Sequence, residues 1–584
     1  MMRYVIDIET EGLENVKHLW CVVVRCAITG NVLSSTSENN HEESFKLIQE
    51  ADELIGHNII NFDLPILRSF GCIPSPVCLI SDTLVMTRVV WSDLRNDDFK
   101  RTGFVKELIG SHSLKAWGVR MGTLKTDFEA ASFSAWTPEM QTYCEQDTAV
   151  TLALYNKIKC ANTPQEVFTL ETSVAQICKM IEVNGWAFDE VEADKLMSIL
   201  LCKKLELKEQ LVNVFPPQVI QMKTKVKTIP FNPGSRQEIA RVLKKMYGWT
   251  PTETTPTGQP KIDESVLQEM EYPEAKLLCD YLLIVKRLGQ VAEGDESWLK
   301  LVKNGRLHGR INTNGAVTGR ATHSKPNMSQ VPAGRSLYGA ECRALFVPSP
   351  KMVLVGADAS GLELRCLAHF IARFDDGVYG KIVTDGDIHW ENAQAFGLVK
   401  AGTKRDKHDP VLESHRNTSK TLIYAMIYGA GDTKLGSVVG GDDKRGAALR
   451  KSFEKNLPAY KMLQQAVTQK ANSGFLVGLD GRRLPIRSPH SALNTLLQSA
   501  GAVVMKKALC LLTNELTKEG LCFGKAYAIV GWIHDEFQIE CKPAVAELIG
   551  KAAVKAIRDA GEYFCFRVPL DGEYRQGKSW SETH

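Results

Sequence analysis

The stretch from Met352 to Phe374, MVLVGADASGLELRCLAHFIARF, constrains the fold more than any other part of the sequence. Its first six residues, up to Ala357, are apolar and predict a buried strand that ends at Asp358. Apolar residues recur at helical spacing from Ser360, so a helix is expected next. A carboxylate at the tip of a buried strand is well placed to hold a metal ion. Taken alone, the stretch favours a simpler interpretation, a turn followed by a capping box from Ser360 to Glu363.

Length and composition exclude several classes of protein. At 584 residues the chain is too long for one hydrophobic core, so several domains are expected. The net charge is only +3, so any surface that binds nucleic acid must be a local basic patch. Fifteen cysteines without a Cys-x-x-Cys pair argue against a zinc site and for a reducing compartment. Because no signal pattern and no membrane-length apolar run is present, we expect a soluble cytosolic protein.

Acidic residues near the start of the chain form an ordered series. Strand-like alternation places Asp7 and Glu9 on one face, where two carboxylates repel each other unless a cation lies between them. Asp63 ends the segment His-Asn-Ile-Ile-Asn-Phe-Asp, and a helix that begins with a Thr-Pro pair places Tyr143 and Asp147 on one face. A solvated edge strand explains the first pair equally well.

The middle of the chain carries long helical patterns, one of them over Glu190–Val214. Lys223, Lys225 and Lys227 follow on a short link that we expect to be exposed. A helical spacer explains this region, although an arm with lysines at its tip also suits contact with a duplex backbone. The basic segment Lys400–His408 predicts a solvated loop that contacts, at most, a template strand or a helicase.

The segment from Arg416 to Gly429 carries a mixed helical stripe. At ~100° per residue, Arg416, Lys420, Tyr424 and Tyr428 drift only ~40° at each step and cover a face ~120° wide. A core helix would not place two cations in that stripe, and a solvated helix would not add two aromatic rings. Cations for a triphosphate and a ring for a base explain the mixture better.

Two polar segments flank this region. The segment Thr318–Pro332 is rich in turn residues and is explained by an ordinary surface loop. His490, Asn494 and Gln498 repeat a four-residue spacing on a predicted helix. They form a polar ladder that either reads base edges or faces solvent.

A hairpin is expected near the end of the chain. Tyr527–Ile533 and Phe537–Ile539 predict two strands, joined by His534, Asp535 and Glu536. Asn-Gly or Asp-Gly would be the usual tight turn between such strands. A locally unfavourable tip on two good strands suggests function and would supply a second carboxylate.

The ordered series Asp-x-Glu, Asn-x-x-x-Phe-Asp and Tyr-x-x-x-Asp resembles the tyrosine-bearing branch of the DEDD family of 3′→5′ exonucleases. By that likeness Asp7, Glu9, Asp63 and Asp147 hold two divalent ions, and Tyr143 orients the attacking water. Two hard cations bridged by carboxylates generate hydroxide and stabilise both oxygens of an in-line phosphoryl displacement.

The strand with Asp358, the Arg-x3-Lys-x7-Tyr-Gly helix and the His-Asp-Glu hairpin resemble motifs A, B and C of family A (DNA polymerase I-like) DNA polymerases. The likeness is greatest to replicative polymerases of short-tailed bacteriophages. It covers nearly the whole chain, including Thr-Gly-Arg-Ala-Thr-His from Thr318 and Gly-Leu-Asp-Gly-Arg from Gly478. The resemblance implies a template-directed enzyme that extends a primer with dNTPs, proofreads with a 3′→5′ exonuclease and replicates phage DNA.

The resemblance also implies a role for each matching position. The residues expected to hold metal at the polymerase site are Asp358, Ala359 through its carbonyl, and Asp535, with Glu536 in a lesser role nearby. The residues expected to bind the incoming nucleotide are Glu363, His389, Arg416, Lys420 (also as general acid), Tyr424 and Tyr428. The residues expected to contact primer-template DNA are Arg320, His490, Asn494, Gln498 and His534.

Two of these positions carry an expectation about substrate choice. By the resemblance, Glu363 is a steric gate whose bulk rejects a ribose 2′-hydroxyl, a role that is compatible with the capping box. Tyr rather than Phe at position 424 implies weak discrimination against dideoxynucleotides.

The fold implied by the resemblance is α/β and multidomain. An RNase H-like 3′→5′ exonuclease domain is followed by a right-hand polymerase of thumb, palm and fingers, with an antiparallel palm sheet. The expected boundaries are 1–165 for the exonuclease, 166–300 for the helical thumb, 301–370 for the first part of the palm, 371–490 for the fingers and 491–584 for the second part of the palm.

The implied cofactor is Mg²⁺, two ions at each active site, with Mn²⁺ as a substitute. The implied partners are primer-template DNA, dNTPs, a phage helicase-primase and a single-stranded DNA-binding protein. Thioredoxin is not expected, because only fifteen residues separate Phe215 from Phe231, where relatives that recruit it carry a long insertion. We expect a monomer that acts, without a membrane, in the cytoplasm of an infected bacterium.

Three other interpretations remain open. A single-subunit RNA polymerase shares the palm design, but the residue at 363 and the exonuclease motifs argue against it. A non-catalytic DNA-binding protein would not need to keep all six motif carboxylates. An exonuclease with a vestigial polymerase half would not need the complete helix from Arg416 to Gly429.

Overall fold

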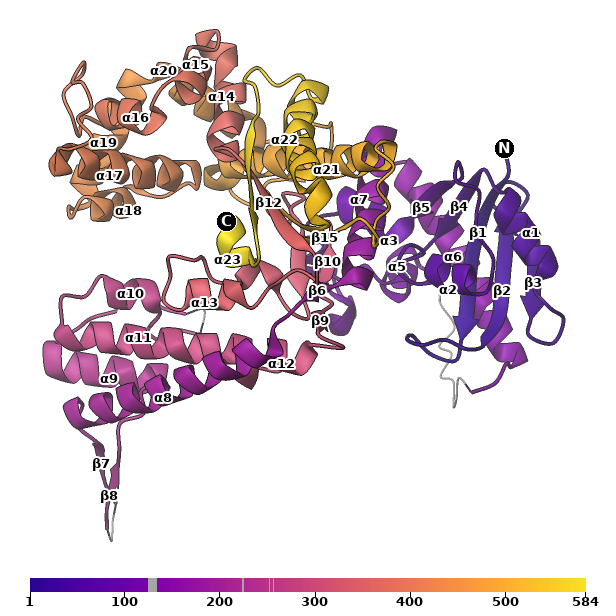
Figure 1. Ribbon diagram of the computed structural model, residues 1–584, viewed down its shortest axis with the longest axis horizontal. Helices are drawn as coiled ribbons and strands as arrows, with labels where there is room; N and C mark the ends of the chain where they lie inside the picture. Colours follow the sequence, from indigo (N-terminus) through magenta and orange to yellow (C-terminus); the bar gives the residue numbers. More distant parts are fainter. Residues whose placement is uncertain (124–133, 223–224, 252, 256) are drawn as a thin grey trace.

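The computed structural model describes residues 1–123, 134–222, 225–251, 253–255 and 257–584, so that Lys223 lies outside the described residues. The chain forms four parts: an N-terminal α/β unit, a first helical arm, a central antiparallel sheet and a second helical arm, which is inserted between β12 and the other strands of that sheet (Figure 1). The N-terminal unit lies at one end of the molecule and the two arms extend at the other, with the central sheet between them (Figure 1).

The N-terminal unit is built on a five-stranded mixed sheet with the strand order β3-β2-β1-β4-β5. β1 runs parallel to β4 and antiparallel to β2, and β4 runs parallel to β5. Its elements are β1 (Arg3–Thr10), β2 (Leu19–Cys26), β3 (Val32–Thr36), α1 (Glu42–Glu50), β4 (Glu53–Gly56), α2 (Asp63–Ser69), β5 (Leu79–Asp82), α3 (Thr83–Val90), α4 (Leu94–Phe99), α5 (Leu114–Met121) and α6 (Pro138–Lys159).

The alternation along β1 decides what each face of this sheet carries. Ile6 and Ile8 pack into a core with residues of α1 and α2, whereas Val5 packs into a second core that includes Leu154 of α6. Asp7 has the same parity as Val5, so it lies on the face covered by α6. The predicted start of α6 is confirmed, since Thr137 accepts a hydrogen bond from the amide of Met140 at 3.2 Å.

The first helical arm ends in a β-hairpin that points away from the rest of the molecule (Figure 1). The predicted helix over Glu190–Val214 is confirmed as α8. The link expected after it is instead a paired ribbon, because Val219 and Gln221 on one strand face Thr228 and Val226 on the other. The elements of this part are α7 (Gln165–Asn184), β6 (Trp186–Ala187), α8 (Glu190–Val214), β7 (Gln218–Gln221), β8 (Val226–Ile229), α9 (Arg236–Tyr247), α10 (Glu264–Gln268), α11 (Pro273–Leu288) and α12 (Trp298–Leu301).

The central sheet has the order β15-β16-β12-β17 and is antiparallel throughout. The predicted strand before Asp358 is confirmed and extends through Ala359, and both strands of the predicted hairpin are present. The elements are β9 (Arg306–Leu307), β10 (Arg310–Asn312), β11 (Thr322–Ser324), α13 (Gly339–Ala344), β12 (Val353–Ala359), α21 (Ala492–Lys518), β15 (Tyr527–Ile533), β16 (Glu536–Cys541), α22 (Ala546–Tyr563), β17 (Gly572–Gly577) and α23 (Trp580–Thr583).

The segment Pro489–Lys518, which contains α21, is the one helix of the described residues long and apolar enough to cross a membrane. However, 83% of its most apolar window is buried inside the protein. It packs against α7, α14 and α22, so its apolar character is accounted for by the core.

The second helical arm contains α14 (Leu362–Asp375), α15 (Val378–Asp385), α16 (Ile388–Phe396), α17 (Pro410–Ile427), α18 (Asp432–Val438), α19 (Asp443–Asn456), α20 (Pro458–Ala471), β13 (Phe475–Val477) and β14 (Arg483–Pro485). The capping box expected at the start of α14 is wrong. Gly361 precedes the helix in the left-handed conformation, with φ of 58°, and no side chain caps it. The Glu363 side chain is therefore not used as a cap and reaches other partners.

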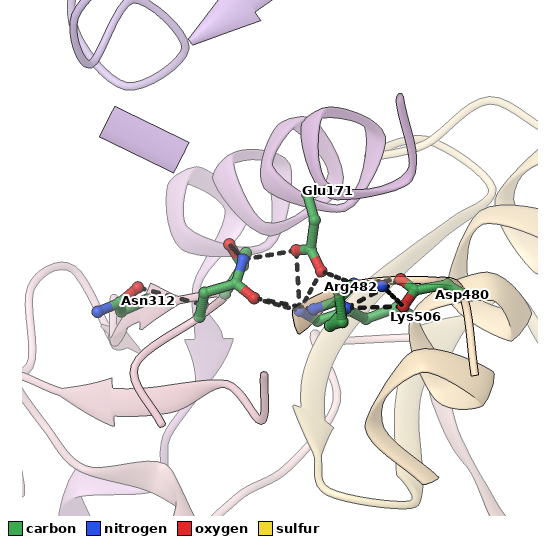
Figure 2. Close-up of polar contacts among 7 residues, drawn as sticks. Glu171, Asn312, Asp480, Arg482 and Lys506 are labelled. Atoms are coloured by element: carbon green, nitrogen blue, oxygen red, sulfur yellow. Dashed lines mark hydrogen bonds and ion pairs between the residues drawn. The ribbon is translucent and has the colours of Figure 1, made fainter. Parts of the chain in front are cut away.

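A buried ionic network joins α7 to α21 (Figure 2). Lys506 donates to both carboxylate oxygens of Glu171, at 2.7 and 2.8 Å, and Arg482 donates to Glu171 at 2.6 Å and to Asp480 at 2.7 Å. Asn314 completes the set, because its amide nitrogen donates to Glu171 at 2.6 Å. The charges of Glu171, Arg482 and Lys506 are buried, and with Asp480 the two cations are matched by two carboxylates.

Candidate active sites

Three acidic residues meet at one end of β12 and β16, the two central strands of the sheet. Asp358 on β12 lies directly opposite Glu536 on β16 in the strand register. The amide of Ala359 donates to the carbonyl oxygen of Asp535 at 3.0 Å, so the hairpin tip lies against the end of β12. His534 takes a left-handed conformation, with φ of 58°, which makes the tight two-residue turn possible. Sequence positions almost 180 residues apart are thereby brought to one place.

The electrostatics of these carboxylates reflect their crowding. Enclosure by the surrounding protein, together with the negative charges of Asp535 and Glu536, raises the pKa of Asp358 to about 7, although its side chain still reaches solvent. Burial likewise raises the pKa of Asp535. Such a pair is poised to accept positive charge.

Glu536 is held differently, by three side chains that the sequence did not indicate. The indole of Trp580 donates to it at 2.7 Å, and the amide of Gln538 donates at 2.5 Å. The Nδ1 atom of His584 lies 2.9 Å from its other oxygen, and this contact raises the pKa of His584. Only the alternation along β16, which places Gln538 on the same face as Glu536, was a signal in the sequence.

The Glu363 carboxylate links the loop that carries Arg320 to the C-terminal end of α17, where Tyr428 lies. The hydroxyl of Tyr428 donates to Glu363 at 2.6 Å, and Arg320 donates to the same oxygen at 3.2 Å. Glu363, Arg320, His534 and Asp535 line one small cavity. Predicted site residues are thus brought together around the end of β12, namely Arg320, Asp358, Glu363, Tyr428, His534, Asp535 and Glu536.

Gly319 allows the loop that carries Arg320 to approach Arg482 closely. Its φ is +77°, and a Cβ there would lie 2.7 Å from a terminal nitrogen of Arg482. The buried network therefore contacts the loop that carries Arg320.

The residues expected to bind a triphosphate lie on α16 and α17, which pack against each other. The ring centroids of His389 and Tyr424 are 6.4 Å apart, and the Ser419 hydroxyl donates to the backbone carbonyl of His389. Burial, together with the charges of Lys420 and Arg416, lowers the pKa of His389 to about 4. The His389 ring is therefore neutral at ordinary pH, beside two cations.

The polar ladder lies along one continuous helix, as expected. Asn494 and Gln498 are partly exposed on α21, which is otherwise largely buried. His490 lies in the first turn of the same helical segment, Pro489–Lys518, where the turn over Pro489–Ser491 is 3₁₀. This first turn is exposed at His490.

A second acidic cluster lies in the N-terminal unit. Burial raises the pKa of Asp7 well above its usual value, and the nearby charges of Asp63, Asp147 and Glu9 add to the effect. Burial also raises the pKa of Asp63 to about 8. The four predicted carboxylates therefore interact, and Tyr143 lies one helical turn before Asp147 on α6.

Two supporting residues of this cluster were missed. Asp82 is fully buried and accepts hydrogen bonds from the amides of Asn58 and Ile60, at 2.9 and 3.2 Å, in the loop that leads to Asp63. The Cys144 thiol donates to Asp7 at 3.2 Å. The position of Asp82 at the end of a strand and before a helix was a usable signal, whereas nothing marked Cys144.

Both clusters fit divalent cations. Among the residues that the structure describes, no three His, Cys, Asp or Glu side chains are close enough together to hold a metal as they stand. However, Asp63 Oδ1 is buried and has no hydrogen-bond partner among the described residues. Raised carboxyl pKa values and an unsatisfied buried oxygen are features that a bound cation would relieve.

Comparison with known protein families matches residues 206–582 to DNA polymerase family A. The chain belongs to this family. This family A polymerase is 33% identical to the DNA-directed DNA polymerase of Enterobacteria phage T3, and the match covers 91% of this chain and 92% of that one. The same values hold for the DNA-directed DNA polymerase of Escherichia phage T7. The chain is thus a DNA-directed DNA polymerase similar to phage enzymes.

A bacterial relative and a solved structure agree with this assignment. DNA polymerase I of Pseudomonas aeruginosa is 26% identical over 464 residues, which cover 76% of this chain and 47% of that one. The POL domain of Pol1 from M. smegmatis, solved in complex with DNA primer-template and dNTP, aligns with a TM-score of 0.78 at 18% identity. The alignment covers 99% of this chain and 96% of that one, so the whole polymerase shares that fold.

Proposed function

We propose that this polymerase has two separate active sites: a synthesis site around Asp358 and Asp535, and a 3′→5′ proofreading site around Asp7, Glu9, Asp63 and Asp147. The observation that supports the proposal most strongly is the presence of two distinct carboxylate clusters, each with raised pKa values, on two different sheets. The order of strands in the N-terminal sheet supports an RNase H-like exonuclease domain.

The proposed division of the chain follows its four parts. Residues 1–165 form the exonuclease, 166–300 the thumb, 301–370 and 491–584 the palm, and 371–490 the fingers. The central antiparallel sheet corresponds to the palm and the two helical arms correspond to thumb and fingers (Figure 1).

At the synthesis site, Asp358, Asp535 and the carbonyl oxygen of Ala359 would hold two Mg²⁺ ions, with Mn²⁺ as a substitute. When bound, these ions supply activation of the primer 3′-hydroxyl and neutralisation of the leaving pyrophosphate. Glu536 keeps its place through Trp580 and His584 and acts at a distance from the reacting atoms.

The nucleotide would lie on the face of α17. Arg416 and Lys420 provide positive charge for the triphosphate, and neutral His389 donates a hydrogen bond to it. Lys420 is also placed to give a proton to the departing pyrophosphate. The Tyr424 ring stacks on the nucleotide, Tyr428 lies at the template side, and the anchored Glu363 carboxylate excludes a 2′-hydroxyl.

We propose that residues near the synthesis site also contact the DNA duplex. Arg320, Gln498 and His534 are proposed to touch the minor groove at the primer end, where acceptor positions are common to all correct pairs. Asn494 and the exposed His490 extend this surface.

At the proofreading site, the four carboxylates would hold two divalent ions, and the Tyr143 hydroxyl would orient the water that attacks the terminal phosphodiester. Asp82 and Cys144 keep Asp63 and Asp7 in place. The product of each turnover would be a nucleoside monophosphate and a primer one residue shorter.

We further propose that the enzyme acts as a monomer in the replication of phage DNA, in the cytoplasm of the infected host. Its partners there would be a helicase-primase and a single-stranded DNA-binding protein. Thioredoxin is not proposed as a partner. The fifteen residues between Phe215 and Phe231, whose rings lie 4.8 Å apart, leave room for little more than the short hairpin of β7 and β8.

The test uses a labelled primer on a longer template with Mg²⁺, once with dNTPs and once without. We expect Asp358→Ala to abolish extension while primer shortening continues, and Asp7→Ala to have the opposite effect. If the wild-type protein shortens the primer but never extends it, the synthesis half is vestigial and the proposal fails.

A further inference from the structure

The loop between α16 and α17 is exposed over most of Lys400–His408, as its basic composition predicted, but it is also hydrogen-bonded to α16. The indole nitrogen of Trp390 donates to the backbone carbonyl of Thr403 at 3.0 Å. The amide of Gly402 donates to the side chain of Gln394 at 2.5 Å. Both Trp390 and Gln394 belong to α16, so the loop is fixed beside the helix that carries His389.

Arg405 of this loop forms ion pairs with two carboxylates of the second helical arm. Its Nη1 atom donates to Asp387 at 2.6 Å, and its Nε and Nη2 atoms donate to the two oxygens of Glu413 at 2.7 and 3.0 Å. The three side chains are between 22% and 27% exposed, so they are shielded from bulk solvent but not sealed. One guanidinium thus satisfies two carboxylates from two different helices.

Asp387 is shared between two arginines. The same Oδ2 atom that accepts from Arg405 also accepts from Nε of Arg416, at 2.7 Å. Asp387 also caps α16, because it accepts from the amide of Trp390 at 3.2 Å. Glu413 lies three residues before Arg416 on α17, on nearly the same face of the helix. Two carboxylates therefore border the arginine proposed to bind the triphosphate.

From this arrangement we infer that Arg405 is a positioning residue for nucleotide binding. By satisfying Asp387 and Glu413, it leaves the terminal Nη groups of Arg416 available to a triphosphate. Without Arg405, both carboxylates would compete for Arg416 as ion-pair partners and would also repel the approaching phosphates. The inference rests on the proposed function, in which Arg416 binds the triphosphate.

The test is steady-state primer extension with dNTP concentration as the variable. Arg405→Ala is expected to raise KM for the dNTP roughly tenfold while kcat changes less than about twofold, because ground-state binding is what is lost. Arg405→Lys keeps the charge but cannot bridge both carboxylates, so it should give an intermediate KM. Lys407→Ala, an exposed cation of the same loop, serves as the matched control and should leave KM unchanged.

A second-site variant separates this role from a structural one. Asp387→Asn removes the competing charge but keeps an oxygen that can cap α16. In the Arg405→Ala background it should lower KM back toward the wild-type value. If Arg405 has only a structural role, the second substitution should instead destabilise the fold further and leave KM raised. Thermal unfolding and primer shortening without dNTPs are measured on every variant, and both should remain close to wild type.

The outcomes are distinguishable. An unchanged KM in Arg405→Ala, or a fall in kcat that Asp387→Asn does not relieve, would overturn the inference. Arg416→Ala is measured in parallel. If it leaves KM unchanged, the proposed role of Arg416 fails, and the inference about Arg405 fails with it. If it raises KM while Arg405→Ala does not, only the inference about Arg405 is wrong.

Discussion

The hydroxyl of Tyr428 donates a 2.6 Å hydrogen bond to the carboxylate of Glu363, which lies 65 residues earlier in the sequence. Arg320 donates to the same oxygen at 3.2 Å. A carboxylate held from two sides cannot swing away from a nucleotide sugar beside it. These two hydrogen bonds would hold the proposed steric gate in one position, and removing either donor should make the Glu363 side chain more mobile.

Glu363→Ala should admit ribonucleotides. Removing the side chain opens the space that a 2′-hydroxyl needs, so we expect discrimination between dNTP and rNTP to fall roughly 10- to 100-fold. The measurement is kcat/KM for each nucleotide in single-nucleotide extension. Tyr428→Phe keeps the carboxylate but removes its anchor, and should weaken discrimination to a smaller extent. Equal discrimination in wild type and Glu363→Ala would refute the gate.

Tyr424→Phe should raise discrimination against dideoxynucleotides. The expectation comes from the family likeness at this position, and the structure places the ring beside His389 and in the field of Glu363. Chain termination on a primed template at a fixed ratio of ddNTP to dNTP measures the effect. Tyr379→Phe, a buried tyrosine of the same arm, is the control. Equal discrimination against dideoxynucleotides in Tyr424→Phe and wild type would refute this expectation.

Acid should destabilise the protein through His369. This buried ring accepts a hydrogen bond at Nδ1 from the amide of Arg567, at 3.1 Å, and burial together with the charges of Arg567 and Arg373 lowers its pKa to about 4. The unfolded chain, with a His pKa near 6.5, binds the proton more readily between these values. The free energy of unfolding should therefore fall as pH decreases from about 6.5 to about 4, by up to about 3 kcal/mol from this residue.

The check is denaturant unfolding at several pH values. His369→Asn retains an acceptor near the position of Nδ1 but does not titrate, so its stability should depend less steeply on pH in this window. His408→Asn, an exposed histidine, should keep the wild-type slope. If the slope of His369→Asn equals that of the wild type, the assignment of this acid sensitivity is incorrect.

The buried network should be sensitive to the loss of one partner. Lys506→Met leaves Arg482 as the one cation of the network for two carboxylates, Glu171 and Asp480, and an uncompensated buried charge costs about 3–5 kcal/mol. Lys506→Met combined with Glu171→Gln removes both charges and should recover part of that stability. Denaturant midpoints measure both variants, with Lys551→Met at a solvent-exposed ion pair as the control. A double variant no more stable than the single one would contradict the account.

Local patterns were sufficient for the elements that carry the chemistry. The apolar run before Asp358, the two strands around His534 and the Thr-Pro start of α6 each have a strong local signal, and all are present. The capping box failed because Gly361 ends the preceding turn in a left-handed conformation, which a Ser-x-x-Glu pattern does not reveal.

Tertiary partners were beyond the reach of the sequence. Glu171 meets Arg482 and Lys506 across more than 300 residues, and no spacing rule links such positions. Trp580 and His584 reach Glu536 in the same way. The loop with Arg405 is mostly exposed, as its composition indicated, but no sequence pattern indicated the contacts of Arg405 with Asp387 and Glu413.

The buried ionic network between α7 and α21 restricts how the parts of the enzyme can move. Glu171 lies near the start of α7, immediately after the N-terminal unit, and its partners belong to the polymerase core (Figure 2). The ion pair between Arg487 and Asp93, at 2.6 Å, joins the N-terminal unit itself to the core, and α7 also packs against α3 of that unit. Swinging the N-terminal unit relative to the core would separate this ion pair and disturb the packing of α7. A frayed primer end would therefore have to travel by itself between the two proposed active sites, and the length of strand that must melt would be set by the protein and not by the sequence being copied.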